Sequence, residues 1–149
     1  MSGDQIPVPT KFDFRVQIPV RRSDTRSATV VGGLFVSHLT YETLIPLINE
    51  AFDAFLENYG WSKADLAGAN IIIPRMEVDY KSEAKAGDIL EFAVSVQNLG
   101  RKSFDLFFHV SQSSGGQAVA LVKISLVFYD YKAKSTLEIP QIFRSKFSK

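Results

Sequence analysis

The chain has 149 residues, enough for one domain with its own hydrophobic core. Its 17 basic and 16 acidic residues give a formal net charge of +1, so no basic field points to nucleic acid or to an acidic membrane surface. Cysteine is absent, which excludes disulfides, thiolate nucleophiles and cysteine-zinc sites. The first residues lack the apolar core of a secretion signal, and no apolar run approaches the ~20 residues of a membrane span. We therefore expect a cytoplasmic protein without a membrane partner.

The first third of the chain predicts one strand and one irregular apolar segment. Residues 1–10 contain two prolines that interrupt regular pairing, which predicts a flexible lead-in. Apolar and polar residues alternate over residues 12–18, as in a half-buried strand. Residues 19–27 are polar and turn-like. Residues 28–36, ATVVGGLFV, place two apolar pieces around Gly32-Gly33, which predicts either a small hairpin or a buried loop.

The strongest helical pattern lies at residues 40–59. Apolar side chains recur there at spacings of three and four and occupy more than one face, so we expect a sheet to enclose this helix. Thr40 or Thr43 can cap its start, and Gly60 can end it. If Thr43 is the cap, Pro46 lies in the tolerated first turn. If Thr40 is the cap, Pro46 removes one backbone hydrogen bond and kinks the helix.

The second half of the chain predicts four antiparallel strands, at residues 71–80, 90–96, 104–110 and 118–129. Pro74 indicates that the first of them is an edge strand or contains a bulge. Residues 118–129 are apolar on both faces, which predicts a central strand or a subunit contact. The residues after Pro140 include Arg144, Lys146 and Lys149, and we expect a loose tail at residues 141–149.

This order of elements favours a single α+β domain over residues 1–149. One helix cannot cover both faces of a five-stranded sheet, so the sheet is expected to curl around it.

Several short strings carry a family resemblance. They are His38-Leu39-Thr40 with Glu50-Ala51 in the helix, Val78-Asp79-Tyr80 before Ala86-Gly87-Asp88, Gly100-Arg101-Lys102-Ser103-Phe104, and residues 120–130 followed by Pro140. In this order they resemble the hotdog-fold thioesterases of the 4-hydroxybenzoyl-CoA thioesterase type. The resemblance implies a curled antiparallel sheet wrapped around one long central helix. It also implies an acyl-CoA or acyl-carrier-protein thioester as substrate, no cofactor beyond the coenzyme A of that substrate, and a homodimer or homotetramer.

The sequence departs from that family at its usual catalytic carboxylate. The family typically has a DTDxxGHV stretch, and Ser23-Asp24-Thr25 matches its beginning, but Arg26 stands where the second Asp is expected. Either another carboxylate has taken over hydrolysis, or the protein binds acyl-CoA or an acyl carrier without catalysis. A hydratase or dehydratase that uses His38 is a third hypothesis, although the usual Pro-Gly after that histidine is missing.

Thioester hydrolysis needs backbone N–H groups that polarise the carbonyl and a group that attacks or activates water. Glu42 is the acid nearest the predicted helix start and is our first candidate; its alternative role is to balance the helix dipole. His38 is a second candidate base, or a cap. Asp24 is a third candidate, or a turn residue. Glu50, further along the helix, is expected to be a buried polar partner. With two histidines and no cysteine, no metal site is expected.

Arg101, Lys102 and Ser103 lie on the turn where the resemblance implies contacts with the phosphates of coenzyme A. Two cations and a hydroxyl suit phosphate oxygens. A solvated turn is the alternative interpretation of the same three residues.

Overall fold

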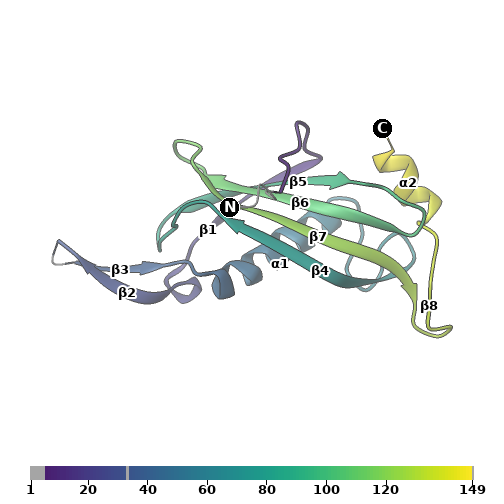
Figure 1. The fold of residues 1–149 in the computed structure, drawn as a ribbon, viewed down its shortest axis with the longest axis horizontal. Helices are drawn as coiled ribbons and strands as arrows, with labels where there is room; N and C mark the ends of the chain where they lie inside the picture. The colour runs from purple at the N-terminus through teal and green to yellow at the C-terminus, as the bar shows by residue number, and fades with distance from the viewer. Residues whose placement is uncertain (1–5, 33, 149) are drawn as a thin grey trace.

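The computed structural model describes residues 6–32 and 34–148. The lead-in residues 1–5, Gly33 of the predicted turn and Lys149 of the tail lie outside the described residues. The elements, in chain order, are β1 (Phe14–Pro19), the short 3-10 helix η1 (Arg22–Asp24), β2 (Arg26–Val31), β3 (Leu34–His38), α1 (Tyr41–Glu57), β4 (Asn70–Tyr80), β5 (Ile89–Gln97), β6 (Ser103–Gln112), β7 (Ala118–Asp130), β8 (Ser135–Thr136) and α2 (Gln141–Phe147) (Figure 1).

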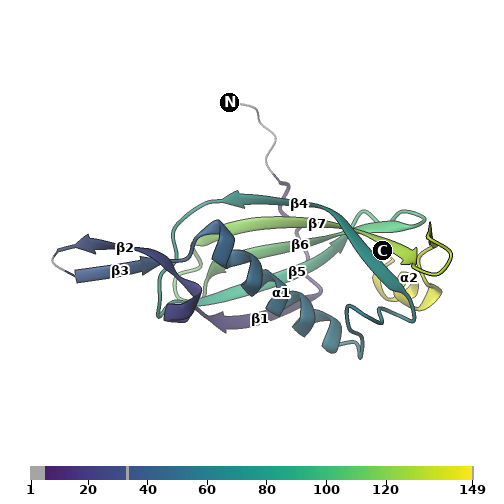
Figure 2. The same cartoon turned by 90° about the horizontal axis from the view of Figure 1, so that it is seen from below.

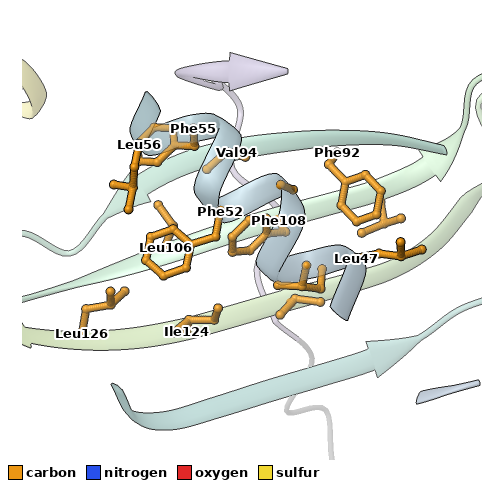
Figure 3. Close-up of a cluster of buried hydrophobic side chains, with 14 of the residues drawn as sticks. Leu47, Phe52, Phe55, Leu56, Phe92, Val94, Leu106, Phe108, Ile124 and Leu126 are labelled. Atoms are coloured by element: carbon orange, nitrogen blue, oxygen red, sulfur yellow. The ribbon is translucent and has the colours of Figure 1, made fainter. Parts of the chain in front are cut away.

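The main sheet curls around α1, which confirms the predicted hotdog fold. Its strands are antiparallel in the order β1-β5-β6-β7-β4, with β8 beside β7. Figure 2 shows α1 lying across the concave face. The buried side chains between helix and sheet include Leu47, Phe52, Phe55, Phe92, Leu106, Phe108 and Ile124 (Figure 3). Among the described residues, no helix is both long and apolar enough to cross a membrane.

Thr40, and not Thr43, is the N-cap of α1. The N–H of Thr40 donates to the hydroxyl of Thr43 at 2.8 Å, and the carbonyl of Thr40 accepts from the N–H of Leu44 at 2.8 Å. This cap places Pro46 in the second turn. Because proline has no N–H, the carbonyl of Glu42 lacks the donor that a helix normally supplies four residues later.

The predictions for the two apolar strands at residues 71–80 and 118–129 are confirmed. β4 is an edge strand, and its register against β7 shifts between Ile72 and Arg75, at Pro74. β7 is central, because it pairs with β6 on one side and β4 on the other. The second side of β4 is unpaired within the described part of this chain.

The prediction of a loose tail after Pro140 is wrong over residues 141–147. α2 begins directly after Pro140 and buries Phe143 and Phe147, which lie one turn apart. Phe143 contacts Trp61 at 5.7 Å between ring centroids, and Phe147 contacts Tyr59 at 5.3 Å. The two phenylalanines give this short helix an apolar face that closes the core beyond the C-terminal end of α1.

The segment before β1 crosses the outer, convex face of the sheet. Residues 6–13 form no helix or strand, in keeping with the two prolines, yet Ile6 is only 5% exposed. It packs against Phe107 and Leu121, whose side chains lie on the face opposite α1. The lead-in is therefore attached to the body at Ile6, a contact that the sequence pattern did not predict.

The apolar segment at residues 28–36 belongs to a hairpin and not to a buried loop. β2 and β3 form a two-stranded sheet of their own, with Val31 opposite Leu34 at the turn. Figures 1 and 2 both show this hairpin extending past the end of the main sheet, beside the start of α1. Gly32 has φ of +56°, a value that favours glycine.

Candidate functional site

The turn at residues 84–87, between β4 and β5, connects the elements around the start of α1 by backbone hydrogen bonds. Gly87 adopts φ of +95°, and its N–H donates to the carbonyl of Val20 at the end of β1. The N–H of Ala86 donates to Ser37 in β3, and the N–H of Leu39, just before α1, donates to Ala84. This turn therefore fixes where β1 ends, where β3 ends and where α1 begins.

The first turn of α1 presents free backbone donors. The N–H groups of Tyr41 and Glu42 precede the first residue that has an acceptor four positions earlier within the helix. The aligned peptide dipoles add partial positive charge at this end. Glu42 is exposed in this turn. The arrangement suits a carbonyl oxygen on which negative charge develops.

An apolar groove of about 350 Å³ opens beside these donors. It is lined by Leu39, Thr40, Tyr41, Tyr80, Lys81, Ser82 and Glu83. Tyr41 is 71% exposed, and partial burial raises the pKa of Tyr80 to about 12, so the phenol of Tyr80 is neutral at physiological pH. The groove can therefore receive an apolar or aromatic group next to the positive end of a helix.

His38 lies at the edge of this region. It ends β3, forms a backbone bridge with Lys85 and keeps 21% of its side chain exposed. Its Nδ1 is 3.5 Å from Oε2 of Glu83, an acid that also lines the groove. Nothing in the sequence pattern pointed to Glu83, because it sits on an exposed loop and only the fold brings it to His38.

Arg21 holds the carboxylate of Asp24 by hydrogen bonds. The carboxylate accepts hydrogen bonds from the backbone N–H of Arg21 at 2.8 Å and from Nε and Nη2 of the same residue at 3.1 Å. These bonds hold the pKa of Asp24 below its usual value. Asp24 therefore has the turn-capping role foreseen as its alternative, on one wall of a depression of about 360 Å³.

Glu50 lines the same depression and is exposed. The prediction that it is a buried polar partner is therefore wrong. Pro46 and Leu47, in the second turn of α1, also line this depression. It is a second hollow, distinct from the apolar groove, and Arg21 pairs with one of its two acids.

Arg101, Lys102 and Ser103 lie at the opposite end of the molecule. They join β5 to β6 beside α2, whereas the groove lies at the other end of α1, which at ~1.5 Å per residue spans about 25 Å. Arg101 lies 3.6 Å from Glu138, and Nζ of Lys102 donates to Thr136. Ser103 is exposed. Within one chain the structure thus places His38 and Glu42 near the start of α1, Asp24 in the separate depression, and the three predicted phosphate contacts at the opposite end.

Comparison with known proteins gives one family match. A family model for the thioesterase-like superfamily matches residues 20–147. No curated protein sequence matches the chain.

Several solved structures share the fold. A 1,4-dihydroxy-2-naphthoyl-CoA thioesterase from Synechocystis superposes with a TM-score of 0.74 and 16% identity, covering 90% of this chain and 94% of its own. A probable thioesterase from Escherichia coli gives a TM-score of 0.71 and 23% identity, covering 90% and 96%. A gentisyl-coenzyme A thioesterase gives 0.68 and 21%, covering 91% and 100%. At these identities the similarity establishes the fold.

Proposed function

The chain belongs to the thioesterase-like superfamily, and from this premise we propose that it hydrolyses an acyl-CoA or acyl-carrier-protein thioester at the N-terminal end of α1. The observation that supports this most directly is the apolar groove beside the free N–H groups of Tyr41 and Glu42. The acyl group would lie in the groove with its thioester carbonyl at these donors.

The proposed reaction needs no group beyond the chain, water and the substrate. Glu42 accepts a proton from water as the water oxygen bonds to the acyl carbon. The helix N–H groups stabilise the resulting oxyanion. When the carbon–sulfur bond breaks, the thiolate leaves with the bonding electrons and takes up the proton, which releases a thiol and a carboxylic acid.

His38 is the second candidate for the base. Its contact with Glu83 resembles the carboxylate–imidazole pairing that orients histidine in other hydrolases. Asp24 ranks behind both, because Arg21 already occupies its carboxylate.

The position of Arg101 and Lys102 supports a homodimer with composite sites. β4 has 11 residues and, in the part of the chain that the structure describes, one unpaired side; Ile73 on it is 44% exposed. Antiparallel pairing of two β4 edges about a two-fold axis would set the β5–β6 turn end of one copy beside the α1 start of the other. Arg101 and Lys102 of that second copy, with the hydroxyl of Ser103, would then bind the phosphates of coenzyme A.

The acyl group remains to be identified by experiment. Two of the neighbours with this fold are thioesterases for 1,4-dihydroxy-2-naphthoyl-CoA and gentisyl-coenzyme A, and the groove offers the rings of Tyr41 and Tyr80. A panel of short, long and aromatic acyl-CoA thioesters, including those two, would be tested by release of free thiol. The protein adds no background, since it has no cysteine.

Glu42→Gln is expected to lower kcat about 10²- to 10⁴-fold with the fold intact, as for loss of a general base. Glu57→Gln, an exposed glutamate at the other end of the same helix, is the matched control and should retain wild-type turnover. If His38→Asn abolishes turnover while Glu42→Gln does not, His38 is the base. Tight coenzyme A binding without turnover of any thioester would contradict hydrolysis and identify a binding protein.

A further inference from the structure

A strap, residues 6–13, crosses the convex face of the sheet before β1 begins. Near one end, Oδ2 of Asp13 accepts a hydrogen bond from the N–H of Val96 in β5 at 2.8 Å. At the other end, the N–H of Ile6 donates to Oδ2 of Asp79 in β4, the edge strand on the far side of the sheet. Figure 2 shows this segment passing behind the strands, on the side away from α1. The strap therefore spans β6 and β7, which lie between those two strands in the sheet.

Two side chains of the strap pack on the sheet. Ile6 contacts Phe107 and Leu121. The ring of Phe12 lies 6.2 Å from the imidazole of His109, measured between centroids, at a tilt of 48°. Between these two contacts the strap borders a hollow of about 430 Å³. Closure of the strap therefore depends on few contacts, and one of them involves a histidine, whose charge changes near neutral pH.

The surroundings of His109 favour its neutral form. The side chain is half-buried in β6, opposite Ala93 of β5 and Leu121 of β7 in the register. Burial lowers the pKa of His109, and the positive charge of Arg15 lowers it further, against a smaller opposite effect of Glu91. The closed strap is therefore most stable when the imidazole carries no charge.

Phe12 already interacts with one cation. The guanidinium of Arg15 lies 5.1 Å from the centroid of its ring. Because His109 lies against the same ring, a proton on the imidazole would bring a second positive charge to it. Repulsion between the two cations and the cost of burying an imidazolium both oppose the closed strap.

The acids on this face already have partners. The charged side chains on the strap and on the strands of this face are Lys11, Asp13, Arg15, Arg75, Glu77, Asp79, Glu91, Asp105 and Lys123. The contacts of the five acids are Glu91 with Arg15 at 2.6 Å, Asp13 with the N–H of Val96, Asp79 with the N–H of Ile6, and Glu77 and Asp105 with Lys123 at 3.8 and 3.9 Å. An imidazolium beneath Phe12 would therefore have to share a carboxylate that is already bound.

We propose that the strap is an acid-released latch, which protonation of His109 opens at Phe12, uncovering Phe107 and Leu121 on the convex face. A histidine whose pKa is lowered in the closed form contributes its full stabilisation above the ordinary value of ~6.5. This contribution is lost as the pH falls from ~6.5 to the lower value of the closed form. The latch is therefore closed at neutral pH and loosens in mild acid.

The latch ends beside the apolar groove. Asp79, which accepts the N–H of Ile6, directly precedes Tyr80 in β4, and Tyr80 lines the groove. Opening of the strap therefore releases the part of β4 that borders the groove from its attachment to the start of the chain.

The first test is an NMR titration of the ring protons of His109 in the full chain. His109→Gln identifies its signals, because His38 is the other histidine of the chain. The pKa of His109 should lie below ~6.5 in the wild type, and Phe12→Ala should raise it toward ~6.5. Val8→Ala, which changes an exposed side chain of the same strap, is the matched control and should leave this pKa unchanged.

The second test measures opening by the reactivity of an introduced thiol, since the chain has no cysteine of its own. Ile6→Cys places the thiol at the buried end of the strap, and Val8→Cys places it at an exposed position two residues away. The ratio of the two reaction rates at each pH cancels the change in thiolate fraction. This ratio should rise as the pH falls from about 7.5 to about 5.5, by at most about tenfold for each unit of pKa difference.

Two further variants show whether His109 causes the opening. With His109→Gln added, the ratio of rates should stay low and independent of pH. With His109→Lys added, which places a permanent positive charge beneath Phe12, the ratio should already be high at about pH 7.5.

Three results would overturn the proposal. They are a wild-type His109 that titrates at ~6.5, a Phe12→Ala variant in which the pKa of His109 is unchanged, and a His109→Gln variant that keeps the pH dependence of the ratio. None of these measurements uses a thioester, so their outcome is independent of the proposed hydrolysis.

Discussion

The backbone N–H of Ile6 donates a 3.0 Å hydrogen bond to Oδ2 of Asp79, which attaches the start of the chain to the edge strand β4. The side chain of Ile6 covers Phe107 and Leu121 on the convex face. An apolar part of that face is thereby kept from water by a segment without secondary structure.

Ile6→Ala should lower the free energy of unfolding by about 2 kcal/mol, the lower end of the range for a buried isoleucine, because the contact lies at the rim of the protein. Urea denaturation measures the change. Val8→Ala, two residues away but 53% exposed, is the control and should shift stability by less than about 0.5 kcal/mol. Equal effects of the two substitutions would show that Ile6 is not packed in solution.

Asp24→Asn tests the bond with Arg21. Because the pKa of Asp24 is depressed in the folded state, its contribution is complete above the ordinary carboxyl value of ~3.9 and is lost as the pH falls through the lower folded value. The variant should be less stable by about 1.5 kcal/mol at pH 7, the lower end of the range for hydrogen bonds to a charged group, because the Arg21 side chain is exposed to solvent. Its deficit relative to the wild type should shrink below about pH 4. A deficit that persists at lower pH would contradict the ion pair.

The composite site can be tested by mixing two inactive variants. One carries Glu42→Gln and the other carries Arg101→Ala with Lys102→Ala. If each site takes Glu42 from one copy and the cations from the other, a mixed dimer has one intact site and one site that lacks both. After random exchange, kcat/KM per chain should recover to about a quarter of the wild-type value. No recovery, with subunit exchange shown by mass spectrometry, would place all three residues in a site within one chain or exclude them from a shared site.

Phe143→Ala should lower the free energy of unfolding by about 3–5 kcal/mol, since this side chain is fully buried among other aromatic rings. Ile142→Ala, on the same helix but 62% exposed, is its control. Thermal unfolding followed by circular dichroism distinguishes them. Similar melting temperatures for the two variants would mean that α2 does not pack on the core.

The sequence predicted the parts of the fold that repeat a pattern. The spacing of apolar residues located α1 and the strands with inward-facing side chains such as Phe92 and Phe108. The spacing could not predict that Ala93 and Phe107 are buried on the convex face. The segment that covers part of that face has no repeating pattern of apolar residues. α2 was missed because its seven residues contain only three apolar side chains, of which Phe143 and Phe147 lie one turn apart, too few to establish a helical period.

The site was predicted less completely than the fold, for a topological reason. Sequence proximity placed His38 and Glu42 at the start of one helix, and the structure agrees. Glu83 reaches His38 only through the path of the loop after β4. The distance between Glu42 and Arg101 depends on the ends of the sheet at which α1 starts and the β5–β6 turn lies. The local sequence pattern does not predict either end.

The position of α2 also has a consequence for how the protein is made. The aromatic core beyond α1 is closed by Phe143 and Phe147, which are synthesised after every strand of the main sheet. β1 likewise cannot pair until β5 has been synthesised, because Phe14 of β1 pairs with Val94 of β5. Such long-range pairing is slow to form. The nascent chain must therefore carry an unfinished apolar surface until α2 has been synthesised, and during that interval chaperones are expected to bind it.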